Sequence, residues 1–101
     1  MIATSKTTDG TSFFGVTIQA TVKSLTQLLG KPAYDYNDGT EKVNYTWEME
    51  TSNGDVFTVY DWKEYRPIHE DEHIEWHIGG FNAEATEQAR KELLNTYYKG
   101  K

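Results

Sequence analysis

Three residues with metal-binding or acid–base chemistry occur at alternate positions in the second half of the chain. His73, Glu75 and His77 alternate with apolar residues, a spacing that places all three side chains on one face of a β-strand. One metal ion could not contact both histidines, because the step from His73 to His77 spans about 13 Å of strand. We therefore expect neither a metal site nor a cofactor, and we interpret these residues as a solvent-facing strand surface that includes His77 as a candidate binding residue.

A second group of residues has the types found in metal-dependent nucleases. Asp61, Trp62 and Lys63 end one expected strand, and Glu48 and Glu50 lie on the neighbouring strand. In nucleases of the PD-(D/E)xK type, such carboxylates hold Mg²⁺ and the lysine orders the attacking water. The tripeptide is short, and the net charge of -6 opposes DNA binding. We keep this enzyme as an alternative and expect a protein without catalytic activity.

Aromatic and basic residues occur together in the expected loops. The aromatic share of the chain is 14%, and several tyrosines lie outside the periodic segments, next to lysine or arginine. Such a rim could stack a nucleobase on its rings and pair a phosphate with its cations. The predicted binding residues of this rim are Tyr34, Tyr36, Lys63, Tyr65 and Arg66. The alternative interpretation is that the loop tyrosines only cap the core.

An acidic run between two histidines provides a different candidate surface. The run contains Glu70, Asp71 and Glu72. A negative surface of this kind could imitate DNA phosphates and occupy the basic groove of a nuclease. A solvated loop is the alternative explanation for the same charges.

The periodicity of the chain predicts the elements that position these residues. Strand alternation at 13–18 is followed by a helix over 22–29, and two alternating runs joined by Asn53-Gly54 predict a β-hairpin over 43–63. A strand follows at 74–78, and a helix at 83–98. The order β-α-β-β-β-α predicts an α+β fold, an antiparallel sheet with two helices packed on one face.

The hairpin turn sets the expected register of the sheet. A two-residue turn at Asn53-Gly54 pairs Ser52 with Asp55 and sets Trp47 opposite Tyr60. This register predicts an aromatic face under the helices that carries Val43, Tyr45, Trp47, Met49, Val56, Tyr60 and Trp62. It predicts a free, acidic face that carries Asn44, Thr46, Glu48, Glu50, Phe57, Val59, Asp61 and Lys63.

Length and composition set further expectations. A chain of 101 residues fits one domain, which we place at 12–99, after a polar segment at 1–11 that we expect to be flexible. The chain has no cysteine and no long apolar stretch, which predicts a cytoplasmic protein that does not enter a membrane. The excess of acidic residues argues against general nucleic-acid binding.

Three segments of the chain carry a resemblance to known proteins. GDVFTVYDWKEYR and EHIEWHIGG, preceded by ATVKSLTQLLGKP, resemble segments of small uncharacterised proteins from tailed bacteriophages. The similarity covers about residues 14–95. It implies a phage accessory protein in the cytoplasm of the infected bacterium, a class that includes inhibitors of host defence. It implies no particular site residues.

Together these observations predict a non-catalytic, phage-type binding protein that counteracts host defence. It would do so by sequestering a nucleotide signal or by blocking an effector as an acidic, anti-CRISPR-like inhibitor. Its expected partner is therefore a small nucleotide or a host defence protein. Besides the nuclease, a structural or assembly role is open, in which the free sheet face bearing Phe57 and Val59 pairs with a second copy.

Overall fold

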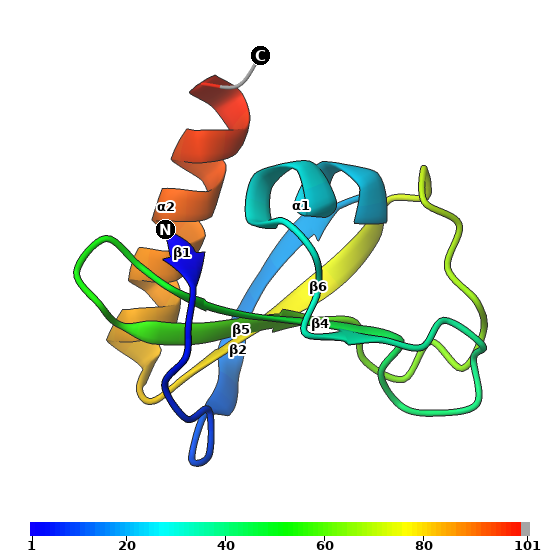
Figure 1. The fold of residues 1–101 in the computed structure, drawn as a ribbon, viewed down its shortest axis with the longest axis horizontal. Coiled ribbons are helices and arrows are strands. Elements are labelled where there is room, and N and C mark those ends of the chain that lie inside the picture. The colour runs from blue at the N-terminus through cyan, green and yellow to red at the C-terminus, as the bar shows by residue number, and fades with distance from the viewer. Residues whose placement is uncertain (100–101) are drawn as a thin grey trace.

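The computed structural model describes residues 1–99 and has an α+β fold, as predicted. Its elements are β1 (Ile2–Ala3), β2 (Ser12–Ala20), α1 (Val22–Leu29), β3 (Tyr34–Asp35), β4 (Tyr45–Glu50), β5 (Val56–Tyr60), β6 (Ile74–Gly80) and α2 (Ala83–Lys99). The strands form one antiparallel sheet in the order β1-β4-β5-β6-β2, and β3 also pairs with β4 (Figure 1). None of the described helices is long and apolar enough to cross a membrane.

Helix α1 begins and ends where the sequence predicts. Thr21 caps its N-terminus, since the Thr21 hydroxyl accepts from the Ser24 N–H and the Ser24 hydroxyl accepts in return from the Thr21 N–H. Gly30 ends the helix with a φ of 84° and donates its N–H to the Thr26 carbonyl at 2.8 Å. Val22, Leu25 and Leu29 are buried, which turns this short helix toward the sheet.

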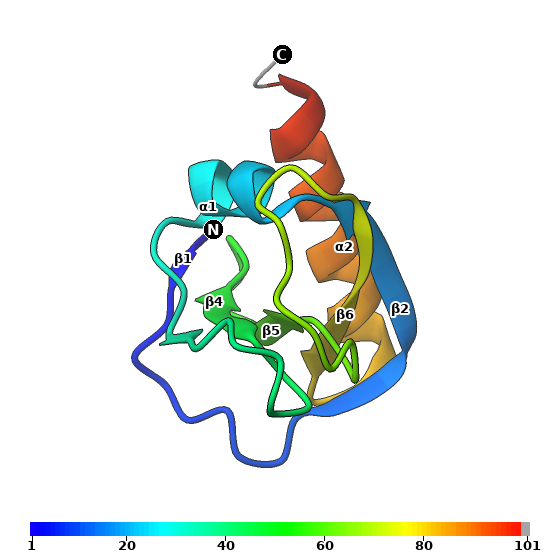
Figure 2. The ribbon, with the colours of Figure 1, turned by 90° about the vertical axis from the view of Figure 1, so that its right-hand side faces the viewer.

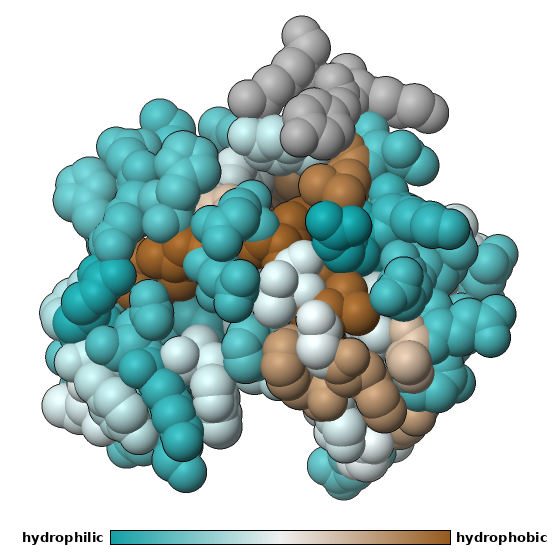
Figure 3. Space-filling model, turned by 180° about the vertical axis from the view of Figure 1, so that it is seen from behind, coloured by the Kyte–Doolittle hydropathy of each residue, from teal (hydrophilic) through white to brown (hydrophobic). Residues whose placement is uncertain are grey.

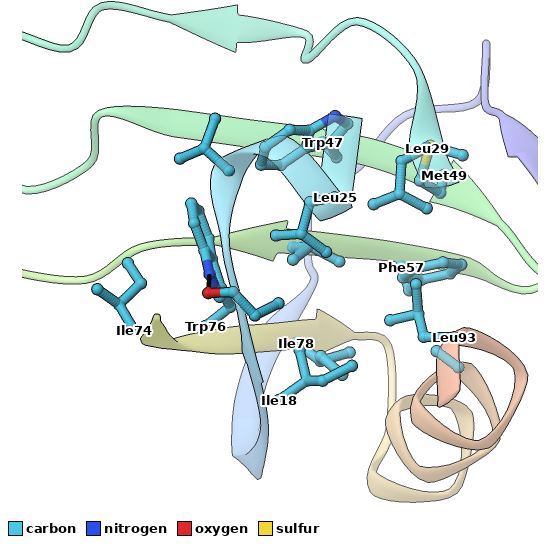
Figure 4. Close-up of a cluster of buried hydrophobic side chains, with 14 of the residues drawn as sticks. Ile18, Leu25, Leu29, Trp47, Met49, Phe57, Ile74, Trp76, Ile78 and Leu93 are labelled. Carbon is cyan, nitrogen blue, oxygen red and sulfur yellow. Dashed lines mark hydrogen bonds between the residues drawn. The ribbon is translucent and has the colours of Figure 1, made fainter. Parts of the chain in front are cut away.

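Both helices contribute to one core on one face of the sheet. Figure 4 shows Leu25 of α1 beside Trp47 of β4 and Trp76 of β6, and Leu93 of α2 beside Phe57 of β5. The two indole rings meet edge to face, with centroids 5.6 Å apart. Each indole N–H donates to a main-chain carbonyl, Trp47 to Gly30 at 2.8 Å and Trp76 to Ala20 at 2.9 Å. These bonds hold the two rings beside the residues that precede and follow α1.

The register of the β4–β5 hairpin differs from the prediction by one residue. Trp47 pairs with Val59 rather than with Tyr60, because the loop contains three residues, 52–54, rather than two. Gly54 has a φ of 84°, and its N–H donates to the Thr51 carbonyl at 2.9 Å, as in a type I turn followed by a left-handed glycine. Because strand side chains alternate between faces, the shift of one residue moves every side chain of β5 to the other face.

The corrected register exchanges the two sets of side chains on β5. Phe57 and Val59, predicted on the free face, are completely buried in the core. Tyr60 and Trp62, predicted under the helices, lie on the open face. The sequence predicts that Phe57 and Val59 are on a free face that could pair with a second copy. Their placement on that face is wrong, so they cannot form such a contact. On β6 the prediction is confirmed, since Ile74, Trp76 and Ile78 are buried.

Part of the N-terminal segment 1–11, which the sequence predicts to be flexible, pairs with the sheet. Ile2–Ala3 forms β1, which pairs with Glu50 and Met49 at the outer edge of β4. The Thr4 hydroxyl donates to Glu50 at 2.6 Å, and the Thr8 hydroxyl donates to Glu48 at 3.1 Å. These partners are more than 35 residues away along the chain, so local periodicity does not reveal them.

Strand β2 forms the opposite edge of the sheet, as the side view shows (Figure 2). Its pairing with β6 shifts between Phe13 and Thr17, where Gly15 has a φ of 87°. Beyond this bulge the outward carbonyl of Thr17 accepts a hydrogen bond from Arg90 Nε of α2 at 2.9 Å. Seen from behind, this side shows a band of hydrophobic side chains between hydrophilic groups (Figure 3).

Candidate functional site

Four aromatic side chains form a contiguous group on the open face of the sheet. This aromatic cluster consists of Phe13, Tyr60, Trp62 and His77, which come from β2, β5, the residues after β5, and β6. The His77 ring is at its centre. It stacks on Phe13 at a centroid distance of 3.8 Å and lies 5.5 Å from Tyr60 and 6.3 Å from Trp62. The cluster joins three strands without contributing to the core under the helices.

Strand pairing explains why these rings meet. Tyr60 pairs directly with His77, and Phe13 pairs with Gly79, the next open-face position along β6. Gly79 has no side chain to separate its neighbours: a Cβ there would lie 2.6 Å from Thr58 Oγ1 and 3.5 Å from the Tyr60 ring. Any larger residue at position 79 would therefore displace the side chains around the cluster.

Two lysines lie beside the exposed Trp62 ring. Lys42 Nζ is 5.8 Å and Lys63 Nζ 5.6 Å from the ring centroid, distances at which an ammonium group and an indole attract each other. The Trp62 side chain is 40% exposed. The main chain holds the two lysines together, because the Lys63 N–H donates to the Lys42 carbonyl at 2.7 Å. The result is a solvent-accessible aromatic surface with two positive charges at its border.

Polar side chains, two of them fully buried, fix the two loops that carry these lysines. The connections 36–44 and 61–73 lie side by side at one end of the sheet (Figures 1 and 2). Asp61 is completely buried and accepts from the main-chain N–H groups of Asn44 and Tyr45, both at 2.9 Å. The Asn44 amide donates to Asp61 and to the Arg66 carbonyl, both at 3.0 Å. Asn37 exchanges two hydrogen bonds with the main chain of Ile68, at 2.7 and 2.9 Å. We call these three side chains, Asn37, Asn44 and Asp61, the polar latch.

Glycine is required where the two loops touch. Gly39 has a φ of 78°, and a Cβ there would lie 2.5 Å from the Cα of Arg66. On the other loop, Lys63 and Tyr65 have φ values of 55° and 51°, a region that non-glycine residues seldom occupy. The polar latch holds the chain on both sides of these two residues, and Lys63 Nζ lies 5.6 Å from the Trp62 ring.

A groove of about 620 Å³ adjoins the aromatic cluster, a volume in the range of small-molecule sites. Lys42 belongs to both, since it lines the groove and lies over Trp62. The other residues that line the groove are Ala33, Tyr34, Glu41, Val43, Thr46 and Glu48. Strand pairing connects the two as well, because Thr46 pairs with Tyr34 on one side and with Tyr60 on the other.

Burial and neighbouring charges alter the titration of three side chains here. Partial burial lowers the pKa of His77, and the Glu75 carboxylate opposes this effect. Burial raises the pKa of the Tyr60 hydroxyl. The pKa of Tyr34 is raised by loss of contact with water and then by the charge of Glu41, which lies close to it in the groove. We therefore expect His77 to be uncharged at pH 7, so that its ring stacks on Phe13 as a neutral imidazole.

The structure brings some of the predicted binding residues together and separates others. Lys63 and His77 both contact Trp62, and Tyr34 lines the adjoining groove. Tyr36 and Tyr65 are exposed, and they belong neither to the cluster nor to the groove lining. Of the predicted rim, Lys63 thus borders the cluster and Tyr34 the groove, whereas Tyr36 and Tyr65 lie outside both.

Arg66 and the acidic run neutralise each other in part. The Arg66 guanidinium binds both carboxylate oxygens of Glu72, with Nη1 2.7 Å from Oε1, and it also pairs with Glu64. The bond from Arg66 lowers the pKa of Glu72, and the same pair raises the pKa of Arg66. Glu70 and Asp71 are exposed. Arg66 is thus occupied, and the acidic run presents less free charge than its sequence indicates.

The geometry of Asp61 contradicts the site expected for a nuclease. The prediction placed Asp61 on the exposed face with Glu48 and Glu50, whereas its carboxylate is buried and bonded to Asn44 and Tyr45. Glu48 and Glu50 instead accept hydroxyl hydrogen bonds from the N-terminal segment. Within residues 1–99, no group of three or more histidine, aspartate and glutamate side chains is arranged to hold a metal ion.

Sequence reasoning missed Phe13, Tyr60, Trp62 and Lys42 as site residues. Tyr60 and Trp62 were assigned to the core by the two-residue turn, although a three-residue loop would have buried the more apolar pair Phe57 and Val59. That choice was available from the hydrophobic pattern alone. Lys42 carries no local signal, because only the contact between two distant loops brings it to Trp62.

Comparison of the chain with protein-family models, with curated proteins and with solved structures found no match. The resemblance to phage accessory proteins therefore stays a prediction. The functional argument rests on the site itself.

Proposed function

We propose that the protein is a non-catalytic binding protein that holds a small nucleotide on the open face of its sheet. The observation that supports this most directly is the pair of lysines at the exposed ring of Trp62. An exposed indole offers a surface on which a base stacks, and adjacent ammonium groups pair with its phosphate. The net charge of -6 disfavours a long polyanion, so the ligand is a small nucleotide rather than a nucleic-acid strand.

The resemblance to phage accessory proteins gives this binding a biological role. In an infected bacterium, a protein that sequesters a nucleotide signal would counteract host defence without catalysis. The second form of the hypothesis, an acidic inhibitor of a host effector, has less support, because Glu72 is paired with Arg66.

Tryptophan fluorescence provides a selective test. Trp47 and Trp76 are completely buried and Trp62 is 40% exposed, so a ligand that quenches the fluorescence by stacking acts on Trp62. We expect purine mononucleotides to quench this emission, and calorimetry to give a binding heat. Replacing Trp62→Phe removes the quenching signal, and Trp62→Ala weakens binding by about 1–3 kcal/mol, the usual contribution of one stacked base.

Variants of single side chains show whether the nucleotide binds on the open face or at the loop tyrosines. Lys63→Ala should weaken the binding of a nucleotide more than that of the corresponding nucleoside, because the lysine acts on the phosphate. Tyr36→Ala is the control for the loop rim, since Tyr36 is exposed and lies outside the cluster, at the start of the loop that carries Lys42. If Tyr36→Ala abolishes binding and Trp62→Ala does not, the site is the loop rim and the open-face proposal is wrong. An absence of heat and quenching across mono- and dinucleotides would refute nucleotide binding as a whole.

A further inference from the structure

A row of open-face side chains extends from the groove to the centre of the aromatic cluster. Tyr34 pairs with Thr46, Thr46 with Tyr60, and Tyr60 with His77. Neighbouring strands lie about 4.8 Å apart, so the row from Tyr34 to His77 covers about 14 Å of the sheet. A single base on Trp62 would occupy one end of this row and leave the groove at the other end empty.

The two ends of the row differ in chemistry. The end at Trp62 has Lys63 and aromatic rings. The groove end has the ring of Tyr34, which is 39% exposed, and the carboxylates of Glu41 and Glu48. Lys42 lies between them, since it borders both. A positive charge between two ring surfaces matches a phosphate that joins two nucleosides.

The carboxylates specify what the groove would select. Ionised carboxylates only accept hydrogen bonds, so they favour a base edge with adjacent N–H donors. Guanine has such an edge, with its ring N–H next to its amino group, whereas adenine has an amino group next to an acceptor nitrogen. The Thr8 hydroxyl donates to Glu48 Oε2 at 3.1 Å and orients that carboxylate. Negative charge in the groove also keeps a phosphate at Lys42 rather than beside Tyr34.

We infer that the groove is a second base subsite, and that the preferred ligand is a dinucleotide with guanine in the groove, its second base on Trp62 and its linking phosphate at Lys42. This inference rests on the proposed function, because it extends the same site. It adds a ligand size and a base preference that stacking on Trp62 alone does not provide.

The test compares GMP, AMP, the linear dinucleotide GpG and the linear dinucleotide ApA by calorimetry and by Trp62 quenching. We expect GpG to bind at least tenfold more tightly than either GMP or ApA. Tyr34→Ala should reduce the affinity for GpG, and it should leave unchanged the quenching of Trp62 by AMP, whose base has no preference for the groove. Glu41→Ala should remove the preference for GpG over ApA. Tyr36→Ala, an exposed tyrosine outside the groove, should change none of these values.

The outcomes separate this inference from the proposed function. If GMP quenches Trp62 and GpG binds no more tightly, the second subsite is refuted and the proposed function stands. If GpG and ApA bind equally and more tightly than GMP, the guanine preference is refuted. If no ligand quenches Trp62 or gives heat, both proposals fail together. Circular dichroism of each variant verifies that a loss of binding is not a loss of the fold.

Discussion

Trp47 and Trp76 on the covered face of the sheet are completely buried, whereas Trp62 on the open face keeps 40% of its surface in contact with water. Both buried indoles donate to main-chain carbonyls and pack against the helices. On the open face, Trp62 contacts only rings and lysine ammonium groups among the contacts described for it. The same residue type is thus part of the core on one face and of an accessible surface on the other. Folding requires the first arrangement, and the second is compatible with binding.

The largest effect is expected from the covered face. Trp76→Ala removes a fully buried ring and its hydrogen bond to Ala20, so we expect a loss of about 4 kcal/mol in the free energy of unfolding. Urea unfolding followed by circular dichroism measures this change. A loss no larger than that of Trp62→Ala would contradict the energetic division between the faces.

The polar latch should come second, because its buried bonds fix the two loops at the end of the sheet. Asp61→Ala leaves the main-chain donors of Asn44 and Tyr45 without their acceptor, and we expect a loss of about 3 kcal/mol in the free energy of unfolding. Asp71→Ala is the control, since Asp71 is exposed, and it should change stability by less than about 0.5 kcal/mol. The same urea titration compares the two variants, and equal midpoints would show that Asp61 is not a structural residue.

A matched pair of glycines tests the contact between the two loops. Gly39 and Gly30 have φ values of 78° and 84°, but only at Gly39 would a new Cβ meet the backbone of Arg66. We expect Gly30→Ala to cost about 1–3 kcal/mol from the strain of its backbone alone, and Gly39→Ala to cost more, because it adds the clash with Arg66. Thermal unfolding compares the two variants. Because the loops hold Lys42 and Lys63 beside Trp62, Gly39→Ala should also weaken nucleotide binding. Unchanged binding would show that the contact between the loops is not needed for the site.

His77 on the open face should make the free energy of unfolding depend on pH, and this effect should be smaller than the losses described above. Burial lowers the pKa of His77 in the folded protein, so near its unfolded pKa of about 6.5 the unfolded chain binds more protons. The contribution of His77 to the free energy of unfolding is therefore complete above about pH 6.5. It is lost as the pH falls through the lowered pKa of the folded protein. NMR titration of the imidazole and urea unfolding at several pH values measure both quantities. Glu75→Gln should lower the pKa further, since Glu75 opposes the effect of burial, and an increase would contradict the assigned cause.

The smallest effect is expected for Trp62→Ala. Its ring is outside the core cluster and is substantially exposed, so the free energy of unfolding should change by less than about 1 kcal/mol. Urea unfolding checks this value beside the binding measurements. A loss as large as that of Trp76→Ala would mean that the open-face rings are a second core rather than a binding surface.

The sequence was sufficient to predict the two helices, the hairpin and the antiparallel sheet. Helix α1 is predictable because Thr21, Leu25 and Gly30 give local signals of its start, its buried face and its end. Trp76 is predictable as a core residue because it alternates with charged neighbours on β6. In each case the signal and its cause lie within a few residues of one another.

The candidate site was predicted only in part, because long-range contacts assemble it. Lys63 and His77 were identified from residue type, and both contact Trp62. Trp62 itself was placed on the wrong face by a one-residue difference in the hairpin loop. Two loops, 36–44 and 61–73, meet to bring Lys42 to Trp62 and to bury Asp61. The sequence of either loop alone does not indicate that they meet.

Strand β2 has a consequence for how the molecule behaves at high concentration. A free edge strand can template the addition of a foreign strand, which leads to aggregation. Here the bulge at Gly15 interrupts the straight run of donors and acceptors, and Arg90 already occupies the carbonyl of Thr17. An incoming chain would have to displace a guanidinium group and match a kinked backbone. The protein is therefore protected against edge-to-edge polymerisation at the edge where its sheet would otherwise be easiest to extend.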